Sequence, residues 1–403
     1  MSSRINVPLS NLRAIVIMIV VAFHSMLPYL ASQPAHPFPF DAAPYRWVAF
    51  PILDHERFFG FDLFCAWQDV SLMSLMFLLA GLFTPASLGR KGSLTYLSDR
   101  WRRIGLPFLF AVAILSPLAY FASYRLTAAD PSIAAFWQHW RALPMWPAGP
   151  EWFLWQVFLF GAIAAALNAL APGIVKALRR IGESVADRPL AFFIGLTALS
   201  VVAYVPLAMI FSPWRWASWG PFAFELSRPL QYLLYFFAGF AIGAAGLDRG
   251  VLHPDGTLAR YWPAWLASAI ISMSAWGGLT SLTLSGWATS PLVERFASAF
   301  AFPIACATGA LCLLSISLRL MRMRNGWLDN LSSNAYSIYI LHYVFVLWLQ
   351  YALLSVSLGA IGKATIVFAA ALALSWIASA GLTSLAQRHL NLSGKRAIAD
   401  QAR

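Results

Sequence analysis

The chain has 403 residues, of which 60% are hydrophobic and only 11% are charged, and its mean hydropathy is +0.67. This composition excludes an ordinary soluble protein, which keeps far more charge on its surface. The formal net charge of +12 does not indicate nucleic-acid binding, because the Lys and Arg residues are dispersed in short segments between apolar runs.

Apolar runs of about 20 residues recur along the whole chain, and this length crosses a bilayer as an α-helix. We therefore predict an all-α, polytopic transmembrane helix bundle over residues 1–386, with a short basic tail at 387–403. The ten predicted spans are residues 12–31, 61–83, 105–124, 151–171, 190–211, 229–246, 262–283, 296–317, 335–355 and 364–385.

Most of the 28 Lys and Arg residues lie on one side of these spans. Because basic loops stay in the cytoplasm, both termini are predicted to be cytoplasmic, in a multi-pass protein of the inner (plasma) membrane. The first apolar run carries ionisable residues and has the length of a full span. We therefore expect it to be retained rather than cleaved as a signal peptide.

The three cysteines, Cys65, Cys306 and Cys312, lie in or beside apolar segments at no metal or redox spacing. We expect them to be small buried hydrophobic side chains. No hydrolase, zinc-protease or nucleotide-binding motif occurs in a fitting context. The prediction is therefore no metal and no tightly bound cofactor.

The first span, NLRAIVIMIVVAFHSMLPYL, contains Arg13 and His24. Eleven residues of α-helix return within roughly 20° of the starting direction and rise ~16 Å, so both side chains share one face at two depths. An ionisable side chain inside a membrane span costs free energy and usually has a function. A cation at one end and a base at the other suit an elongated ligand such as acyl-coenzyme A. The alternative is that His24 is a buried histidine whose hydrogen bonds are made within the protein and which has no catalytic role.

Several segments in chain order then carry a family resemblance. They are the R-x(10)-H helix, LMFLLAGLF (75–83), RWRRIGLPF (100–108), EWFLWQVFLFG (151–161) and LSSNAYSIYILHYVF (331–345). Together they resemble the acyltransferase-3 family of integral membrane acyltransferases. The resemblance implies transfer of an acetyl, succinyl or similar group from a cytoplasmic donor onto a glycan or another acceptor.

Arg100 and Arg103 lie one helical turn apart at the predicted cytoplasmic boundary. Arginine forks suit phosphate, so with Arg13 they are predicted to bind the phosphates of acetyl- or succinyl-coenzyme A. The alternative is that they only orient the span in the membrane, which accounts well for Arg102.

Asp69 lies in the second span at a depth similar to that of His24. A carboxylate on one imidazole nitrogen fixes the tautomer, so we hypothesise that Asp69 orients His24. The chain departs here from family members with a VDxFF segment, because Ser74 is nearer the aligned position. Ala80 likewise stands where the family commonly has serine.

Other polar residues could contact either substrate. Tyr336, Tyr339 and His342 recur at three-residue spacing in the ninth span and could line the donor channel, or the tyrosines could pack helices. Glu151 and Trp152 open the fourth span at the outer surface, where they could bind the acceptor or anchor the helix at the interface.

The outward loops at residues 32–60 and 212–228 are rich in Pro, Trp, Phe and Tyr. This composition is typical of an aromatic belt at the membrane interface. Clustered aromatic rings with a few charged groups also suit a carbohydrate, because rings stack on sugar C–H faces. We keep both explanations.

The residues therefore favour a membrane O-acyltransferase that uses acyl-coenzyme A as donor and an envelope or periplasmic carbohydrate as acceptor. His24 acts either as general base or as transient acyl carrier. The alternative is a transporter or flippase for a polar or lipid-linked solute, with Arg13, His24 and Asp69 as a proton relay. An idle, acyl-responsive membrane partner is a further alternative.

Overall fold

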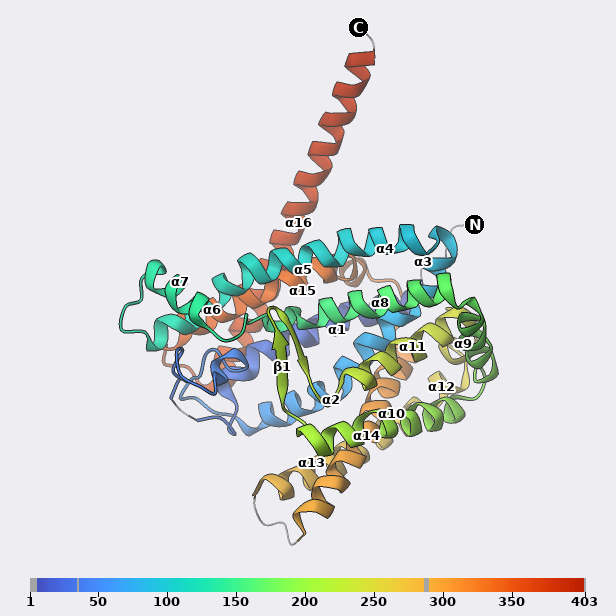
Figure 1. The fold of residues 1–403 in the computed structure, drawn as a ribbon, viewed down its shortest axis with the longest axis horizontal. Helices are drawn as coiled ribbons and strands as arrows, with labels where there is room; N and C mark the ends of the chain where they lie inside the picture. Colours follow the sequence, from blue (N-terminus) through green and yellow to red (C-terminus); the bar gives the residue numbers. More distant parts are fainter. Residues whose placement is uncertain (1–5, 35, 286–289, 402–403) are drawn as a thin grey trace.

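The computed structural model describes residues 6–34, 36–285 and 290–401, which form an α-helical bundle (Figure 1). The predicted all-α polytopic fold is confirmed, and each predicted span falls on a helical segment. The long helices are α1 (Val7–Met26), α2 (Phe59–Leu82), α8 (Trp152–Leu170), α10 (Pro189–Phe211), α11 (Pro229–Ala245), α13 (Trp262–Ser285), α14 (Pro291–Leu320), α15 (Gly326–Leu353) and α16 (Ala360–Gln401).

The third span is built from shorter helices that follow one another without a loop. Its parts are α4 (Ser93–Arg100), α5 (Leu106–Phe110) and α6 (Ser116–Thr127). They are joined by wide, π-helical turns at Trp101–Gly105 and Ala111–Leu115. Wide turns of this kind shift the register of the side chains that follow them.

Fewer helices than the predicted ten meet the length and hydropathy of a membrane span. Within the described ranges, eight helical segments do so, and a ninth is the pair Pro229–Ala245 and Gly250–Arg260, bent by 91°. The segment predicted at 262–283 forms the helix α13, but its many Ser, Thr, Gly and Trp residues lower its hydropathy.

Several short elements lie between the spans and were not predicted. Four are helices: α3 (Thr84–Lys91), α7 (Ile133–Ala142), α9 (Pro172–Ser184) and α12 (Thr257–Arg260). The outer loop at 212–228 forms a β-hairpin of β1 (Trp216–Trp219) and β2 (Phe222–Glu225), in which Trp216 pairs with Glu225.

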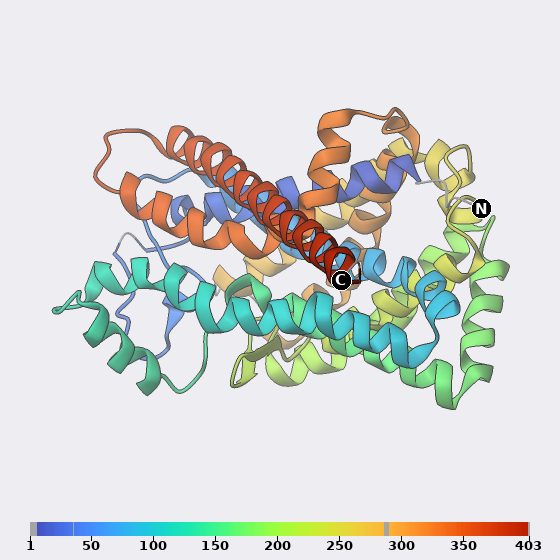
Figure 2. The same cartoon turned by 90° about the horizontal axis from the view of Figure 1, so that it is seen from above.

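The bundle has two distinct ends, seen in Figures 1 and 2. The loop after α1 and helix α7 lie at one end, whereas α3, α9 and the start of α1 lie at the other. The aromatic loop after α1 and the basic helix α3 are therefore at opposite ends of the bundle. Helix α16 continues past the predicted end of its span, and its C-terminal part projects from the bundle (Figure 1).

Helices α2 and α11 pack very closely because glycines replace larger side chains at their contact. A Cβ atom on Gly239 would lie 2.0 Å from the carbonyl oxygen of Leu78, and one on Gly243 would lie 2.1 Å from that of Leu82. Small residues four apart allow this approach between membrane helices. The contact fixes α2, which carries Asp69.

The loop after α1 is tied to the helix ends by charged groups. Asp54 forms an ion pair of 2.7 Å with Lys363 of α16, and both side chains are fully buried. Asp62 of α2 accepts hydrogen bonds from the backbone N–H groups of Ala31 (2.8 Å) and Ser32 (3.0 Å). The loop therefore has a defined path over the outer end of the bundle.

Candidate active site

His24 lies near the end of α1, where the helix loses a backbone hydrogen bond. Its carbonyl would accept from the residue four positions later, but that residue is Pro28, which has no N–H. The side-chain nitrogen of Gln350 on α15 donates to the His24 carbonyl instead, at 2.8 Å. Pro28 therefore leaves the His24 carbonyl available to Gln350, and this hydrogen bond joins α15 to α1 beside His24.

The imidazole of His24 is oriented by two groups. Its Nδ1 lies 2.9 Å from the carbonyl oxygen of Val20 and 3.2 Å from Nε2 of His342. Nδ1 of His342 lies 2.6 Å from the carbonyl oxygen of Tyr339. Since a carbonyl only accepts, each neutral imidazole carries its proton on Nδ1.

This tautomer leaves Nε2 of His24 as the basic nitrogen. Within the part of the chain that the structure describes, Nε2 makes no hydrogen bond. The ring packs edge-on against Tyr343, with centroids 5.3 Å apart. Nε2 of His24 is therefore a pre-oriented base or nucleophile.

His24 lines a cavity of about 770 Å³, a volume typical of small-molecule sites. Helices α1 and α2 form one side of it, with His24, Gln68 and Asp69 among the lining residues. Helices α6, α8 and α15 contribute Tyr120, Trp152, Tyr339 and Tyr343. The rest of the wall comes from the outer loops at 44–50 and 145–150 and from the hairpin region at 214–228. The cavity therefore joins the His24 face to the loops of the outer end.

Asp69 lines the same cavity but binds another partner than predicted. Its two carboxylate oxygens accept hydrogen bonds from Nη1 (2.9 Å) and Nη2 (2.8 Å) of Arg228. Among the described residues it has no hydrogen bond to His24, so the hypothesis that Asp69 orients His24 is wrong. His342 holds that position. The proton relay of the transporter alternative loses its Asp69 step for the same reason.

Arg228 also forms an ion pair of 2.8 Å with Glu225, from its Nε to Oε2. The Arg228 side chain is only 2% exposed. Burial raises the pKa of Glu225 to about 8, against the opposing effect of the Arg228 guanidinium. The cluster of Asp69, Glu225 and Arg228 thus provides fixed polar groups in the cavity wall.

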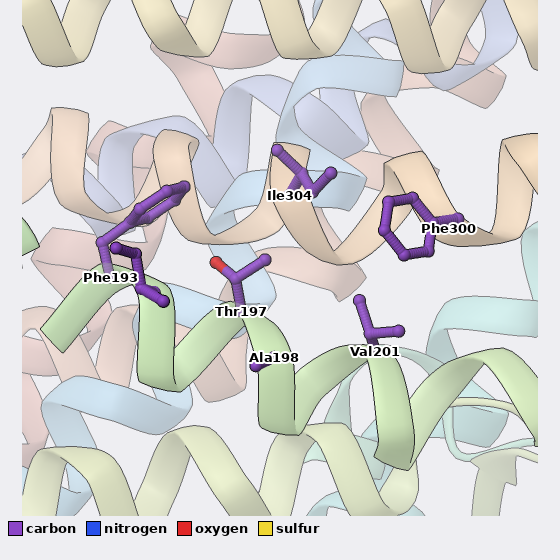
Figure 3. A pocket seen from close by; sticks show the side chains of 7 residues that line it. Phe193, Thr197, Ala198, Val201, Phe300 and Ile304 are labelled. Atoms are coloured by element: carbon purple, nitrogen blue, oxygen red, sulfur yellow. The ribbon is translucent and has the colours of Figure 1, made fainter. Parts of the chain in front are cut away.

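A second, apolar groove lies between α10 and α14 (Figure 3). It has a volume of about 470 Å³ and is lined by Phe193, Ile194, Thr197, Ala198, Val201, Phe300 and Ile304. It shares no lining residue with the His24 cavity, and the Thr197 hydroxyl is the one polar side-chain group among these lining residues.

Comparison with known proteins identifies the family. The model described as an acyltransferase domain, Acyl_transf_3, matches residues 7–380, which is nearly the whole chain. The chain belongs to this acyltransferase family. No curated protein and no solved structure matches it. The protein is a multi-pass membrane enzyme that transfers acyl groups other than aminoacyl groups.

In this acyltransferase, the two residues predicted to contact the acceptor, Glu151 and Trp152, have different surroundings. Trp152 lines the cavity and packs edge-on against Trp216 of β1, with ring centroids 5.4 Å apart. Glu151 does not lie at the open surface as predicted. Its side chain is buried beneath the cavity wall, next to Gly149 and Tyr343.

The three polar residues of α15 also differ in their surroundings. Tyr339 lines the cavity, where its hydroxyl donates to the carbonyl of Pro150. His342 is fully buried behind His24, so it does not line a channel. Tyr336 is half-buried, lies outside the cavity and interacts electrostatically with Arg100.

The predicted phosphate-binding arginines lie outside the His24 cavity. Arg13 and Arg103 are exposed, whereas Arg100 is half-buried and its Nε donates to the hydroxyl of Tyr96 at 3.0 Å. The wide turn that begins at Trp101 changes the regular α-helical register assumed for Arg100 and Arg103. These cations remain free to bind an anion, but they do not form a closed pocket.

Arg228, Glu225 and Gln68 were missed in the sequence. Arg228 lies at the end of the outer loop at 212–228, which was interpreted only through its aromatic residues. The signal was available, because a carboxylate such as Asp69 inside a span requires a cationic partner. Arg228 stands directly before the span that begins at Pro229. The sequence contains no direct indication that this helix packs on α2.

Proposed function

We propose that this acyltransferase moves a short acyl group, such as acetyl or succinyl, from cytoplasmic acyl-coenzyme A to a hydroxyl of a cell-envelope or periplasmic carbohydrate. His24 acts as general base or as transient acyl carrier, and the protein lies in the inner membrane. The observation that carries this proposal is Nε2 of His24. This nitrogen carries no proton, and the ring is oriented by the contacts of Nδ1 with Val20 and His342. His24 lines a cavity that reaches the outer loops.

Arg13 supports the donor half of the proposal. It is exposed on the same helix, eleven residues before His24 and therefore ~16 Å away along the axis. Arg100 lies near Tyr336 of α15, the helix that packs on α1, and together with Arg103 it adds positive charge. A donor with phosphates at one end and a thioester at the end of a long arm matches this separation.

Two chemical routes use the same nitrogen. As general base, Nε2 takes the proton of the acceptor hydroxyl while its oxygen attacks the thioester carbonyl. The C–S bond then breaks, and the thiolate takes that proton from Nε2. As nucleophile, Nε2 attacks the thioester carbonyl, the C–S bond breaks, and coenzyme A leaves as the thiolate. The acceptor oxygen then attacks the acyl group, the C–N bond to Nε2 breaks, and Nε2 takes the hydroxyl proton, which solvent returns to the thiolate.

His342 is suited to both routes. A protonated His24 keeps its Nδ1 proton, which Nε2 of His342 can accept as a hydrogen bond. An acylated His24 must lose positive charge, and the same nitrogen can then receive the Nδ1 proton. His342 is therefore a positioning residue that contacts neither substrate in this arrangement.

The routes are distinguished by mixing the purified protein with radiolabelled acetyl-coenzyme A in the absence of acceptor. Label that remains on the denatured protein, and is absent from His24→Gln, identifies the acyl-carrier route. Release of coenzyme A only when acceptor is added, with no labelled protein, identifies the general-base route.

The donor and acceptor classes are tested by mass spectrometry of envelope glycans from cells with and without the protein. The proposal predicts an added mass of an acetyl, succinyl or similar group on a glycan, present only with the active protein. A cell expressing His24→Ala should resemble the cell without the protein. Acylation of a lipid or protein with unmodified glycans would contradict the carbohydrate acceptor.

A further inference from the structure

The α2 wall of the cavity contains a polar side chain without a partner. Gln68 is only 8% exposed and lines the cavity, and its Oε1 atom makes no hydrogen bond among the described residues. A buried amide without partners costs on the order of 1–3 kcal/mol, so it normally has a ligand or ordered water. Oε1 of Gln68 therefore offers a hydrogen-bond acceptor to a molecule in the cavity.

Asp69, the next residue, offers further hydrogen-bond acceptors to the same space. Its side chain is 39% exposed, and each of its oxygens accepts one hydrogen bond from Arg228. A carboxylate has about four lone-pair positions, so capacity remains on the cavity side. Because the Arg228 fork holds the carboxylate in one orientation, Asp69 is a rigid acceptor for hydroxyl groups.

The Arg228 guanidinium is only 2% exposed and already faces two carboxylates. Its two Nη atoms donate to Asp69, and its Nε forms an ion pair of 2.8 Å with Glu225. An anionic group bound beside Asp69 would lose its hydration next to another carboxylate, and this anionic group would have no cation paired with it. Arg46 and Arg215 also line the cavity, but both are exposed on the outer loops, where solvent and salt screen them.

Aromatic rings complete the cavity. Trp152 and Trp216 form an edge-on pair in its lining, next to the polar wall of α2 in the same 770 Å³ space. Flat apolar rings together with fixed hydrogen-bond acceptors suit a pyranose ring, which has C–H faces and a rim of hydroxyl groups.

We propose that Gln68 and Asp69 form the acceptor subsite of this enzyme and bind the hydroxyl groups of an uncharged sugar ring. The proposal rests on the proposed function and deepens it by naming the acceptor class. Hydroxyls donate to Asp69 and to Oε1 of Gln68, and the Gln68 amide nitrogen donates in return. The subsite excludes sugars that carry a carboxylate on the bound ring.

The test measures sugar binding without any acyl donor. The methyl glycosides of glucose, galactose and mannose, each with the matching uronide, are titrated into purified protein in lipid nanodiscs and followed by saturation-transfer NMR. We expect at least one neutral glycoside to bind at least tenfold more tightly than its uronide. Gln68→Leu should weaken that binding about tenfold, because it removes the buried hydrogen-bonding groups.

Gln156→Leu is the matched control. Gln156 on α8 is also buried, and both of its side-chain polar atoms lack partners among the described residues, but it does not line the cavity. Its substitution should leave sugar binding unchanged. If Gln68→Leu does not fold, Gln68→Met provides the same test with a side chain of nearly equal length.

The result that overturns the subsite is equal binding of glycosides and uronides, unchanged binding in Gln68→Leu, or no glycoside binding at all. Thiol release from acetyl-coenzyme A is measured separately. Neutral glycosides that bind through Gln68 without acyl transfer support the subsite and contradict the proposed function. Acyl transfer to a sugar whose binding does not depend on Gln68 contradicts the subsite alone.

Discussion

The two ends of helix α1 differ in how they hold their functional residue. His24 is surrounded by groups from distant parts of the chain, including His342 and Gln350, and it lines a cavity. Arg13 at the other end is exposed and has no such enclosure. This difference is what the proposed function requires, namely a rigid chemical centre at His24 and an open end for the charged part of the donor.

The ion pairs near each end follow the same division. Lys363 and Asp54 at the predicted outer end are fully buried, whereas Lys91 and Asp99 at the predicted cytoplasmic end are each about a third exposed. Buried pairs are costly to break, because the remaining charge has no solvent. Surface pairs contribute little. The outer loops that form the cavity walls are thus more firmly held than the donor end.

The largest expected effect comes from breaking the buried pair at the outer end. Lys363→Met removes the buried cation that pairs with the Asp54 carboxylate and should lower the free energy of unfolding by about 3–5 kcal/mol. The measurement is unfolding in mixed micelles titrated with SDS. Adding Asp54→Leu to Lys363→Met should restore most of the loss.

Lys91→Met is the matched control at the cytoplasmic end, with an expected loss below about 1 kcal/mol because solvent screens this pair. Similar losses for Lys363→Met and Lys91→Met would remove the distinction between a rigid outer end and an open cytoplasmic end.

The next largest effect is expected at His342. His342→Ala should lower kcat about 100-fold and change the KM for acyl-coenzyme A little, because His24 loses the group that orients it. His342→Gln should recover part of the activity, since its Oε1 atom can accept the His24 Nδ1 proton in a hydrogen bond. Equal activities of the two variants would assign His342 to packing only.

The smallest effect is expected at the donor end. Arg13→Ala should raise the KM for acyl-coenzyme A about tenfold with little change in kcat, because an exposed phosphate contact contributes about 1.4 kcal/mol. Arg102→Ala, also exposed, serves as the control and should leave KM unchanged. A reduced kcat with unchanged KM in Arg13→Ala would place Arg13 in the chemical step instead.

The sequence was most informative where the evidence lies within one helix. The shared face of Arg13 and His24 follows from helical periodicity, and the apolar runs predict the bundle. The partner of Asp69 could not be predicted, because Arg228 lies 159 residues away and reaches it only through the packing of α11 on α2. The hairpin at 216–225 was likewise not predicted, because its residues read as part of an aromatic-rich loop. Residues of this region form a wall of the cavity.

The most direct test of the account is thiol release from acetyl-coenzyme A by purified wild-type protein and His24→Ala, with a sugar acceptor present and with membrane insertion verified for both. The account predicts that His24→Ala inserts normally but releases no thiol above the uncatalysed rate. Release at the wild-type rate by His24→Ala would contradict it.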